Sequence, residues 1–466
     1  MRPLQQSGFA GVGNPPESSF AISSRAALNA CNQRQIEWGV LARSIYFINP
    51  ICYHRCMGNQ RPTKVLIVGG GFGGVRVALD LAKKKLPNTK IILVSDKPHF
   101  EYHASLYRIV AGKSPLEVCI PLDEIFKGKK VEIIEDTIIS VDLSRKLLRG
   151  ESESHYTFDY LVLALGSETS YFDLPGLREL AFGFKSITEA LRLKRHIHEM
   201  FSSCVIASDR ERQCSLHFVI VGGGATGVEL ASELALYTKT LARKHRLDPH
   251  LITLNLIQGG ERLLPSMPLS ISALVEKRLT KLGVNVLVNK RVLKGELEMV
   301  YLKDMEMKTK TVIWTTGIVP NHLYSEIADL SFDEKGRVLV DESFQAKGLS
   351  DVFIIGDAAA YDFTGTAQGA LNQGKYVAAV IYNKLVGTKT PAYVSKKPFY
   401  AIPLGTNFAV CLKNRILLTG RFGWMMRRFL DLKFFLSILP FSKALLAFQS
   451  DKVLWEQCPI CSEASR

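Results

Sequence analysis

Short runs of apolar, β-branched residues alternate with amphipathic stretches from residue 63 onwards. Lys64–Val68 is the first such run, Gly69–Gly74 is rich in glycine, Val75–Lys85 has a helical period, and Ile91–Ser95 is a second apolar run. Strand, glycine turn, helix and strand in this order predict a βαβ unit with parallel strands.

The same unit recurs about 150 residues later. His217–Val221 predicts a strand, Gly222–Gly227 a second glycine turn, Val228–Arg246 a long helix, and Leu251–Ile257 the next strand. Two copies at this separation indicate two nucleotide-binding domains rather than a solenoid. We therefore predict an α/β fold with two Rossmann-like dinucleotide-binding domains.

The first glycine turn has the spacing of a dinucleotide site, Gly69-x-Gly71-x-x-Gly74. The first glycine allows a tight turn, the second lets the backbone approach a pyrophosphate, and the third allows close packing of the helix. Asp96 lies 22 residues beyond Gly74, at the end of the second strand. Its carboxylate can accept hydrogen bonds from a ribose 2′-hydroxyl, which favours an adenine dinucleotide without a 2′-phosphate.

The second turn, Gly222-x-Gly224-x-x-Gly227, differs at the end of its following strand, where Gln258 stands in place of an acid. Glutamine is neutral and does not repel a 2′-phosphate. NADPH is therefore a candidate beside NADH, although no arginine follows immediately to favour it.

Composition adds a question about partners. The 466 residues are 47% hydrophobic and 22% charged, as in ordinary globular proteins, and the net charge is +15. A basic surface attracts anionic lipid, nucleic acid or phosphorylated ligands, and charge alone does not choose among them. Nine cysteines without a regular framework favour a reducing compartment. No metal site is predicted.

The two ends of the chain differ from the rest. Residues 1–60 contain only two acids, Glu17 and Glu37, and we favour a start at Met57 over an organelle transit peptide. Cys458 and Cys461 have the spacing of a redox or metal motif. They lie close to the C-terminus without the strand and helix that would position them, so a frayed tail is favoured.

The segment from Phe399 to Phe448 is rich in Phe, Leu and Ile with interspersed cations. Lys413 to Lys452 contains eight Lys or Arg and two Asp, a net charge of +6. This mixture suits an interfacial element whose cations meet anionic headgroups, and no run of roughly 18 apolar residues predicts a membrane span. The helical projection of Trp424–Leu439 is untidy and Pro440 interrupts it, so a dimer interface or domain-covering helix pair is the alternative.

Three further motifs accompany the glycine turns between residues 63 and 395. Asp159–Gly166 and Val312–Gly317 look like the returning strands of the two domains, and Asp351–Ala358 looks like a flavin-binding strand. The chain resembles the two-dinucleotide-binding flavoproteins, and within them the type II NADH dehydrogenases that reduce quinones. The resemblance implies FAD at the first turn and NADH, with NADPH as an alternative, at the second. The cofactor-binding residues that it implies are Gly69, Gly71, Gly74, Asp96, Gly166, Gly356, Asp357, Gly222, Gly224, Gly227, Gln258 and Gly317.

Four further residues are the catalytic candidates. Glu229 matches the family glutamate close to nicotinamide and flavin, where burial would raise its pKa; an ordinary acid at a helix N-terminus is the alternative. Ala367–Gly374 resembles the quinone-site helix, on which Gln368, Asn372 and Gln373 could present amide donors to quinone carbonyls. Asn372 replaces a glutamine of the family pattern, which leaves the quinone open.

The resemblance also implies the order of domains. It gives an N-terminal extension at 1–60, FAD-binding parts at 61–173 and 321–395, an inserted NAD(P)H-binding domain at 174–320, and a membrane-associating or dimerisation region at 396–466. The predicted activity is ping-pong, non-proton-pumping NADH:quinone reduction at the cytoplasmic face of a membrane, with an organelle inner membrane as the alternative. A quinone and an anionic membrane surface are the expected partners, nucleic acid is not, and a homodimer is an option.

Three other functions remain open from the sequence. A soluble reductase of a ferredoxin or rubredoxin would use the basic surface to steer its partner. A sulfide:quinone reductase needs cysteines beside the flavin; Glu101–Tyr107 has none, and Cys119 is isolated. A nucleotide-sensing binding protein would bind the same cofactors without rapid turnover.

Overall fold

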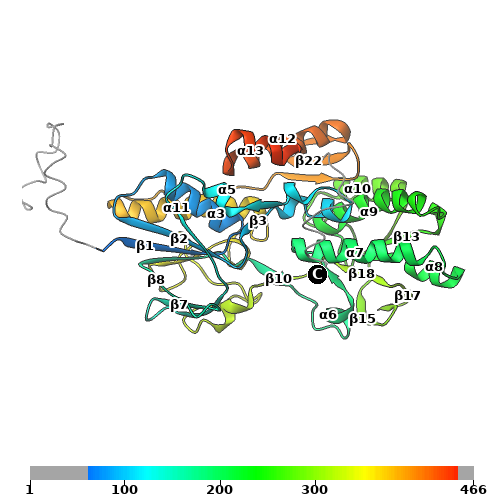
Figure 1. The fold of residues 1–466 in the computed structure, drawn as a ribbon, viewed down its shortest axis with the longest axis horizontal. Helices are drawn as coiled ribbons and strands as arrows, with labels where there is room; N and C mark the ends of the chain where they lie inside the picture. The colour runs from blue at the N-terminus through cyan, green and yellow to red at the C-terminus, as the bar shows by residue number, and fades with distance from the viewer. Residues whose placement is uncertain (1–60, 450–466) are drawn as a thin grey trace, which may run out of the picture. The chain divides into compact units, whose positions relative to one another are not determined.

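Two parallel sheets form the framework of the computed structural model, which describes residues 61–449 (Figure 1). The first has the order β20-β9-β1-β2-β5 and the second the order β11-β18-β12-β13-β14. Their strands are β1 (Thr63–Val68), β2 (Thr89–Ser95), β5 (Glu132–Glu135), β9 (Tyr160–Leu163), β20 (Val352–Ile354), β11 (Phe182–Gly183), β12 (His217–Val221), β13 (Thr253–Ile257), β14 (Val284–Leu287) and β18 (Thr311–Trp314). The whole second sheet comes from residues between β9 and β20.

Helices cover these sheets, and smaller antiparallel sheets extend them. The helices are α3 (Phe72–Lys83), α4 (Tyr107–Val110), α5 (Leu122–Phe126), α6 (Leu177–Leu180), α7 (Ile187–Ser203), α8 (Asp209–Ser215), α9 (Ala225–Lys244), α10 (Leu269–Leu282) and α11 (Ala367–Val386), with 3-10 turns η1 (His103–Ser105), η2 (Pro115–Glu117), η3 (Pro249–Leu251), η4 (His322–Glu326) and η5 (Gly356–Ala358). The added strands are β3 (His99–Glu101), β4 (Cys119–Pro121), β6 (Ile138–Asp142), β7 (Leu147–Gly150), β8 (His155–Thr157), β10 (Ser167–Thr169), β15 (Val292–Glu296), β16 (Met299–Leu302), β17 (Glu306–Lys308) and β19 (Ile318–Pro320). β10 and β19 pair in antiparallel fashion where the chain passes between the two sheets.

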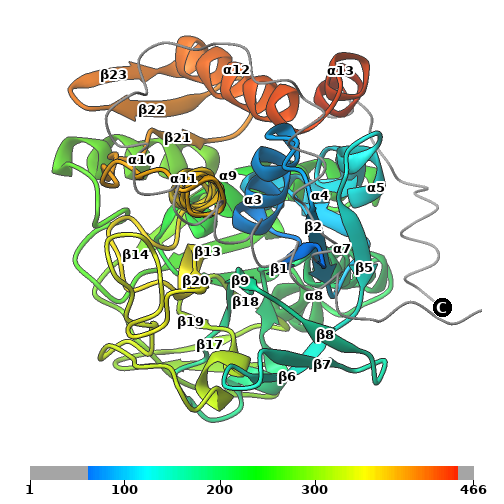
Figure 2. The same ribbon diagram turned by 90° about the vertical axis from the view of Figure 1, so that its left-hand side faces the viewer.

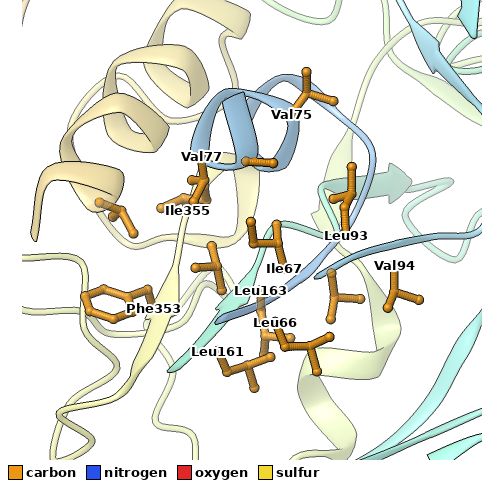
Figure 3. Packing of buried hydrophobic residues seen from close by; sticks show 14 of the residues in the cluster. Leu66, Ile67, Val75, Val77, Leu93, Val94, Leu161, Leu163, Phe353 and Ile355 are labelled. Carbon is orange, nitrogen blue, oxygen red and sulfur yellow. The ribbon is translucent and has the colours of Figure 1, made fainter. Parts of the chain in front are cut away.

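The core of the first half lies between its sheet and α3. Leu66 and Ile67 of β1, Leu161 and Leu163 of β9, and Phe353 of β20 lie close together on the two faces of the sheet, near Val75 and Val77 of α3 (Figure 3). All are buried. Strands covered on both faces read as continuous apolar runs, which is why the sequence predicted them.

The C-terminal segment adds a three-stranded sheet and two helices, drawn in orange and red in Figures 1 and 2. They are β21 (Tyr400–Pro403), β22 (Ala409–Lys413), β23 (Ile416–Thr419), α12 (Gly420–Ile438) and α13 (Phe441–Gln449). α12 packs on β22 and α13, and Phe435, Ile438 and Ala444 join the same apolar core as β1. The segment therefore shares a core with the first half and covers it.

The predicted helices begin later than the observed ones. α3 starts at Phe72 and α9 at Ala225, directly after the N-cap glycines Gly71 and Gly224. The strand predicted from Leu251 starts at Thr253, because the preceding residues form η3. The predicted domain boundaries stay predictions, and the calls on Met57, Cys458 and Cys461 lie outside the described residues. Among residues 61–449, no helix is long and apolar enough to cross a bilayer.

The packing of α3 against α11 gives a first test. A Cβ on Gly374 would lie 2.7 Å from the Gly73 carbonyl oxygen. We expect Gly374→Ala to lower the free energy of unfolding by about 1–3 kcal/mol, because the backbone must move, although alanine favours a helix by about 1 kcal/mol. Urea denaturation measures this change. Lys375→Ala, at an exposed position of the same helix, is the control; a more stable Gly374→Ala protein would contradict the packing described.

Candidate dinucleotide and redox site

The first glycine turn joins β1 to α3 in a geometry that requires glycine. Gly69 has a φ of +112°, and a Cβ there would overlap the Ala164 carbonyl oxygen. A Cβ on Gly74 would overlap the Gly69 carbonyl oxygen, so the third glycine lets α3 approach β1. Gly71, the N-cap of α3, is different, since a Cβ there would meet no atom within 4 Å. The amide end of α3 at Gly71 is therefore open, as the binding of a pyrophosphate requires.

The second turn repeats this geometry between β12 and α9. Gly222 has a φ of +122°, a Cβ on Gly227 would overlap the Gly222 carbonyl oxygen, and a Cβ on Gly224 would meet no atom within 4 Å. Gln258 directly follows β13, and its Oε1 accepts a hydrogen bond of 2.9 Å from the Gly223 amide. The side chain of Gln258 is thus folded onto the turn and brings no charge to it.

The other predicted cofactor residues follow parallel strands. Asp96 comes directly after β2, is exposed, and lies at the edge of the sheet at which Gly69 follows β1. Gly166, Gly317 and Gly356 follow β9, β18 and β20, with φ values of +73°, +74° and +78°. In parallel sheets this carboxyl edge is where ligands bind.

Asp357 contacts two residues that sequence reasoning missed. Its Oδ2 accepts a short hydrogen bond from the Ser167 hydroxyl and lies 3.7 Å from Lys185 Nζ. Lys185 also donates to Ser167, and burial lowers the pKa of its amine. Neither residue belongs to a motif, and they approach Asp357 only because β10 and the start of α7 fold back to it.

The amides of α11 separate into different environments. Gln368 donates to the Phe399 carbonyl (2.7 Å) and accepts from the Phe399 amide (2.9 Å), so its side chain holds the segment that leads to β21. Gln373 is fully buried, accepts from the Gly356 amide (2.7 Å), and its Nε2 has no partner among the described residues. Asn372 is half-buried. Of the three predicted amides, Gln373 thus has an unused donor beside the Gly356 turn.

Glu229 is the fifth residue of α9, and its side chain is 13% exposed. Burial raises its pKa to about 8, and the nearby guanidinium of Arg427 opposes that rise. Arg427 Nη1 lies 3.8 Å from Glu229 Oε1. Burial thus shifts the pKa in the direction expected from the sequence, while the role of Glu229 stays a prediction.

A buried ionic cluster fixes α12 to the first half of the molecule. Arg428 Nη1 lies 2.8 Å from Glu117 Oε1 and 3.3 Å from Asp431 Oδ2, while Arg427 Nε lies 3.0 Å from Asp431 Oδ1. The Tyr102 hydroxyl donates to Asp431 at 2.7 Å. The partners come from η2 and from the loop before η1, more than 300 residues earlier in the chain.

This cluster corrects one inference from the sequence. Arg427 and Arg428 counted among the cations expected to meet lipid headgroups, but each is 7% exposed and paired inside the protein. Lys413, Arg415, Arg421, Lys433 and Lys443 of the same segment are exposed.

The cysteines of the described residues form no disulfide. Cys119, Cys204, Cys214 and Cys411 are all free thiols. Cys119 pairs across β3 and β4 with Glu101, and the hydrogen bonds that His99 makes to Cys119 and Glu101 raise the pKa of His99 to about 9.

Comparison with known proteins gives consistent matches. The family model described as pyridine nucleotide-disulphide oxidoreductase matches residues 63–374. A type II NADH:quinone oxidoreductase of Mycobacterium tuberculosis is 31% identical over 364 residues, which cover 74% of this chain and 77% of the relative. Its counterpart in Staphylococcus haemolyticus is 26% identical, with 80% and 95% covered. The structure of NDH2 from Plasmodium falciparum in complex with NADH has the same fold, with a TM-score of 0.77, 20% identity, and 86% and 99% covered.

A pair of glycine variants separates ligand binding from folding. We expect Gly71→Ala to leave the thermal unfolding of the flavin-free protein unchanged but to weaken FAD binding by about tenfold or more, because the added methyl enters the space for the pyrophosphate. Gly74→Ala should lower the unfolding temperature of the flavin-free protein. Calorimetry and fluorescence titration with FAD measure both quantities; equal losses of stability in the two variants would contradict the assignment.

Proposed function

Because this chain belongs to the pyridine nucleotide-disulphide oxidoreductase family and, within it, to the type II NADH:quinone oxidoreductases, we propose that it transfers electrons from NADH to a quinone through FAD. The observation that supports this most directly is the repeated glycine turn. Each copy stands at the carboxyl edge of its own parallel sheet, and in each the second glycine faces free space. One chain thus offers two dinucleotide sites, as an enzyme that passes electrons between a nicotinamide and a flavin requires.

The residues at the first turn fit FAD. The amide end of α3 at Gly71 suits the pyrophosphate, and the Asp96 carboxylate suits the ribose hydroxyls. The unpartnered Gln373 Nε2 provides a buried donor next to Gly356. FAD, when bound, accepts two electrons from NADH and delivers them to the quinone.

The second turn suits NADH, and Gln258 leaves NADPH acceptable. The amide end of α9 at Gly224 is open to a pyrophosphate. Gln258 has no charge to repel a 2′-phosphate. The guanidinium of Arg262 donates to the Met267 carbonyl and the Ser272 hydroxyl, so it is not available to attract that phosphate. We therefore propose NADH as the main donor with some use of NADPH.

Glu229 and the amides of α11 complete the proposed catalytic set. With a pKa near 8, Glu229 exchanges a proton readily at neutral pH and orients the nicotinamide from the start of α9. Gln373 supplies a buried amide donor, and the half-buried Asn372 lies on the preceding position of α11. Gln368 contributes by fixing the segment before β21 through Phe399.

Stopped-flow absorbance of the purified holoprotein tests this function. We expect NADH to bleach the flavin rapidly, NADPH to do so more slowly, and a short-chain quinone to restore the oxidised spectrum rapidly. Recovery only with ferredoxin or rubredoxin would contradict quinone use and indicate a soluble reductase. Bleaching by sulfide instead, lost in Cys119→Ser, would indicate sulfide:quinone chemistry, and bleaching that no acceptor reverses rapidly would indicate a nucleotide sensor.

We also propose that the C-terminal segment binds a membrane surface peripherally, on the cytoplasmic face. The outer side of α12 exposes Phe422 (75%) and Phe429 (60%), and α13 exposes Phe441 (73%). Exposed cations, among them Arg421 and Lys433, come from the same helices. Large apolar side chains beside cations suit the boundary between acyl chains and anionic headgroups. An organelle inner membrane is the alternative location.

Sedimentation with vesicles of mixed anionic and zwitterionic lipid tests the membrane proposal. We expect the triple change Phe422→Ser, Phe429→Ser and Phe441→Ser to weaken binding by about tenfold or more, because each phenylalanine contributes roughly 1.5–3 kcal/mol on burial. Leu297→Ser, at a position 83% exposed on the β15–β16 hairpin, is the control. If the triple variant instead turned a dimer into a monomer with vesicle binding unchanged, a second copy would be the occupant of this face.

A further inference from the structure

Arg427 is buried in α12, and its guanidinium joins parts of the chain that are far apart in sequence. Nη1 donates to the Ala401 carbonyl of β21 (2.8 Å), and Nη2 donates to the Ala104 carbonyl of η1 (2.5 Å). Nε lies 3.0 Å from Asp431, and Nη1 lies 3.8 Å from Glu229 of α9. The planar group is thus fixed in orientation by two main-chain carbonyls and one carboxylate, and it faces Glu229 across the boundary between α12 and α9.

The other charged and titratable groups around Glu229 leave Arg427 as the cation that favours its ionised carboxylate. Asp431 faces it from α12, Glu233 lies one turn further along α9, and Tyr107 approaches from α4. Both acids disfavour a second negative charge at Glu229, as does burial. Arg427 is the group that acts in the opposite direction.

Arg108 and Lys113 lie near this site, but they act on its neighbour. Burial raises the pKa of Glu233, and the charges of Arg108 and Lys113 oppose that rise. Neither cation shifts the pKa of Glu229. Arg428 lies next to Arg427 in sequence, yet it pairs with Glu117 and Asp431. The two arginines therefore have different roles: Arg428 joins α12 to η2, and Arg427 faces the Glu229 carboxylate of α9.

We infer that Arg427 is a positioning residue for Glu229: the C-terminal helix supplies the cation that holds this carboxylate in place and sets its charge state. The inference rests on the proposed function, in which Glu229 stands beside the nicotinamide. It assigns α12 a role in the redox site in addition to covering the core. Burial raises the pKa of Glu229, and the guanidinium of Arg427 opposes that rise.

Infrared difference spectroscopy of the holoprotein over a pH series tests this directly. The band of the protonated Glu229 carboxyl is identified by its loss in Glu229→Gln, and its midpoint is then measured in Arg427→Gln. We expect the midpoint to move upward by about one pH unit or more, because a carboxylate loses a cation within ion-pair distance. Arg427→Lys, which keeps the charge without the fork, should give an intermediate midpoint and also serves if Arg427→Gln does not fold.

Arg428→Gln is the matched control, because it loosens α12 from η2 without removing the cation that faces Glu229. Its midpoint should move much less than that of Arg427→Gln, because Arg428 acts on Glu229 only through Asp431. The inference would be overturned if the midpoint did not move in either Arg427 variant, or if it moved equally in Arg428→Gln. Arg427 would then serve only to hold α12 in its position.

A second readout distinguishes this inference from the proposed function. The pH profile of flavin reduction by NADH should shift in Arg427→Gln together with the infrared midpoint. If the midpoint moves but NADH does not reduce the flavin in the unchanged protein, the ion pair stands and the proposed function fails. If NADH and quinone turn over normally while the midpoint stays in place, the function stands and the role of Arg427 fails.

Discussion

Two arginines buried in a C-terminal helix must be paired, and their pairing organises the molecule around the redox site. An unpaired charge inside a protein costs several kcal/mol, so Arg427 and Arg428 hold α12 where Asp431, Glu117 and Glu229 can meet them. Glu117 lies in η2, before the strands of the second sheet in the chain, and Glu229 lies on α9, which follows β12 of that sheet. The same two side chains therefore bring both halves and the C-terminal segment into one arrangement. The opposite side of α12 is left free for its exposed apolar residues.

The repeated glycine turn places the ligands in this arrangement. In both copies the first and third glycines are enclosed by neighbouring atoms, while the second faces free space. The enclosed glycines let each helix start close to its strand, and the open one leaves the amide end of the helix to an anion. Glu229 lies two residues after Gly227, so in the proposed function the second turn both accepts a dinucleotide and positions this carboxylate. The proposed dinucleotide sites therefore depend on where β1 and β12 end more than on the composition of the glycine turns.

Local signals explain what the sequence predicted well. His217–Val221 was predicted as a strand and is β12, because a buried strand is an unbroken apolar run. The starts of α3 and α9 were placed too late, since the glycines that cap them also look like turn residues. Contacts across long separations were beyond reach. Nothing near Arg427 in the sequence indicates Glu229 or Ala104 as partners, and nothing near Gln368 indicates Phe399. The candidate roles of Glu229 and of the α11 amides came from family resemblance.

The most direct test of this account is a crystal structure of the flavin-loaded protein with NADH bound. The account predicts the FAD pyrophosphate at the amide end of α3, the flavin ring beside Gly356 and Gln373, and the nicotinamide next to Glu229, with Arg427 still in contact with that carboxylate. A nicotinamide bound away from Glu229, or a flavin at the second turn, would contradict it.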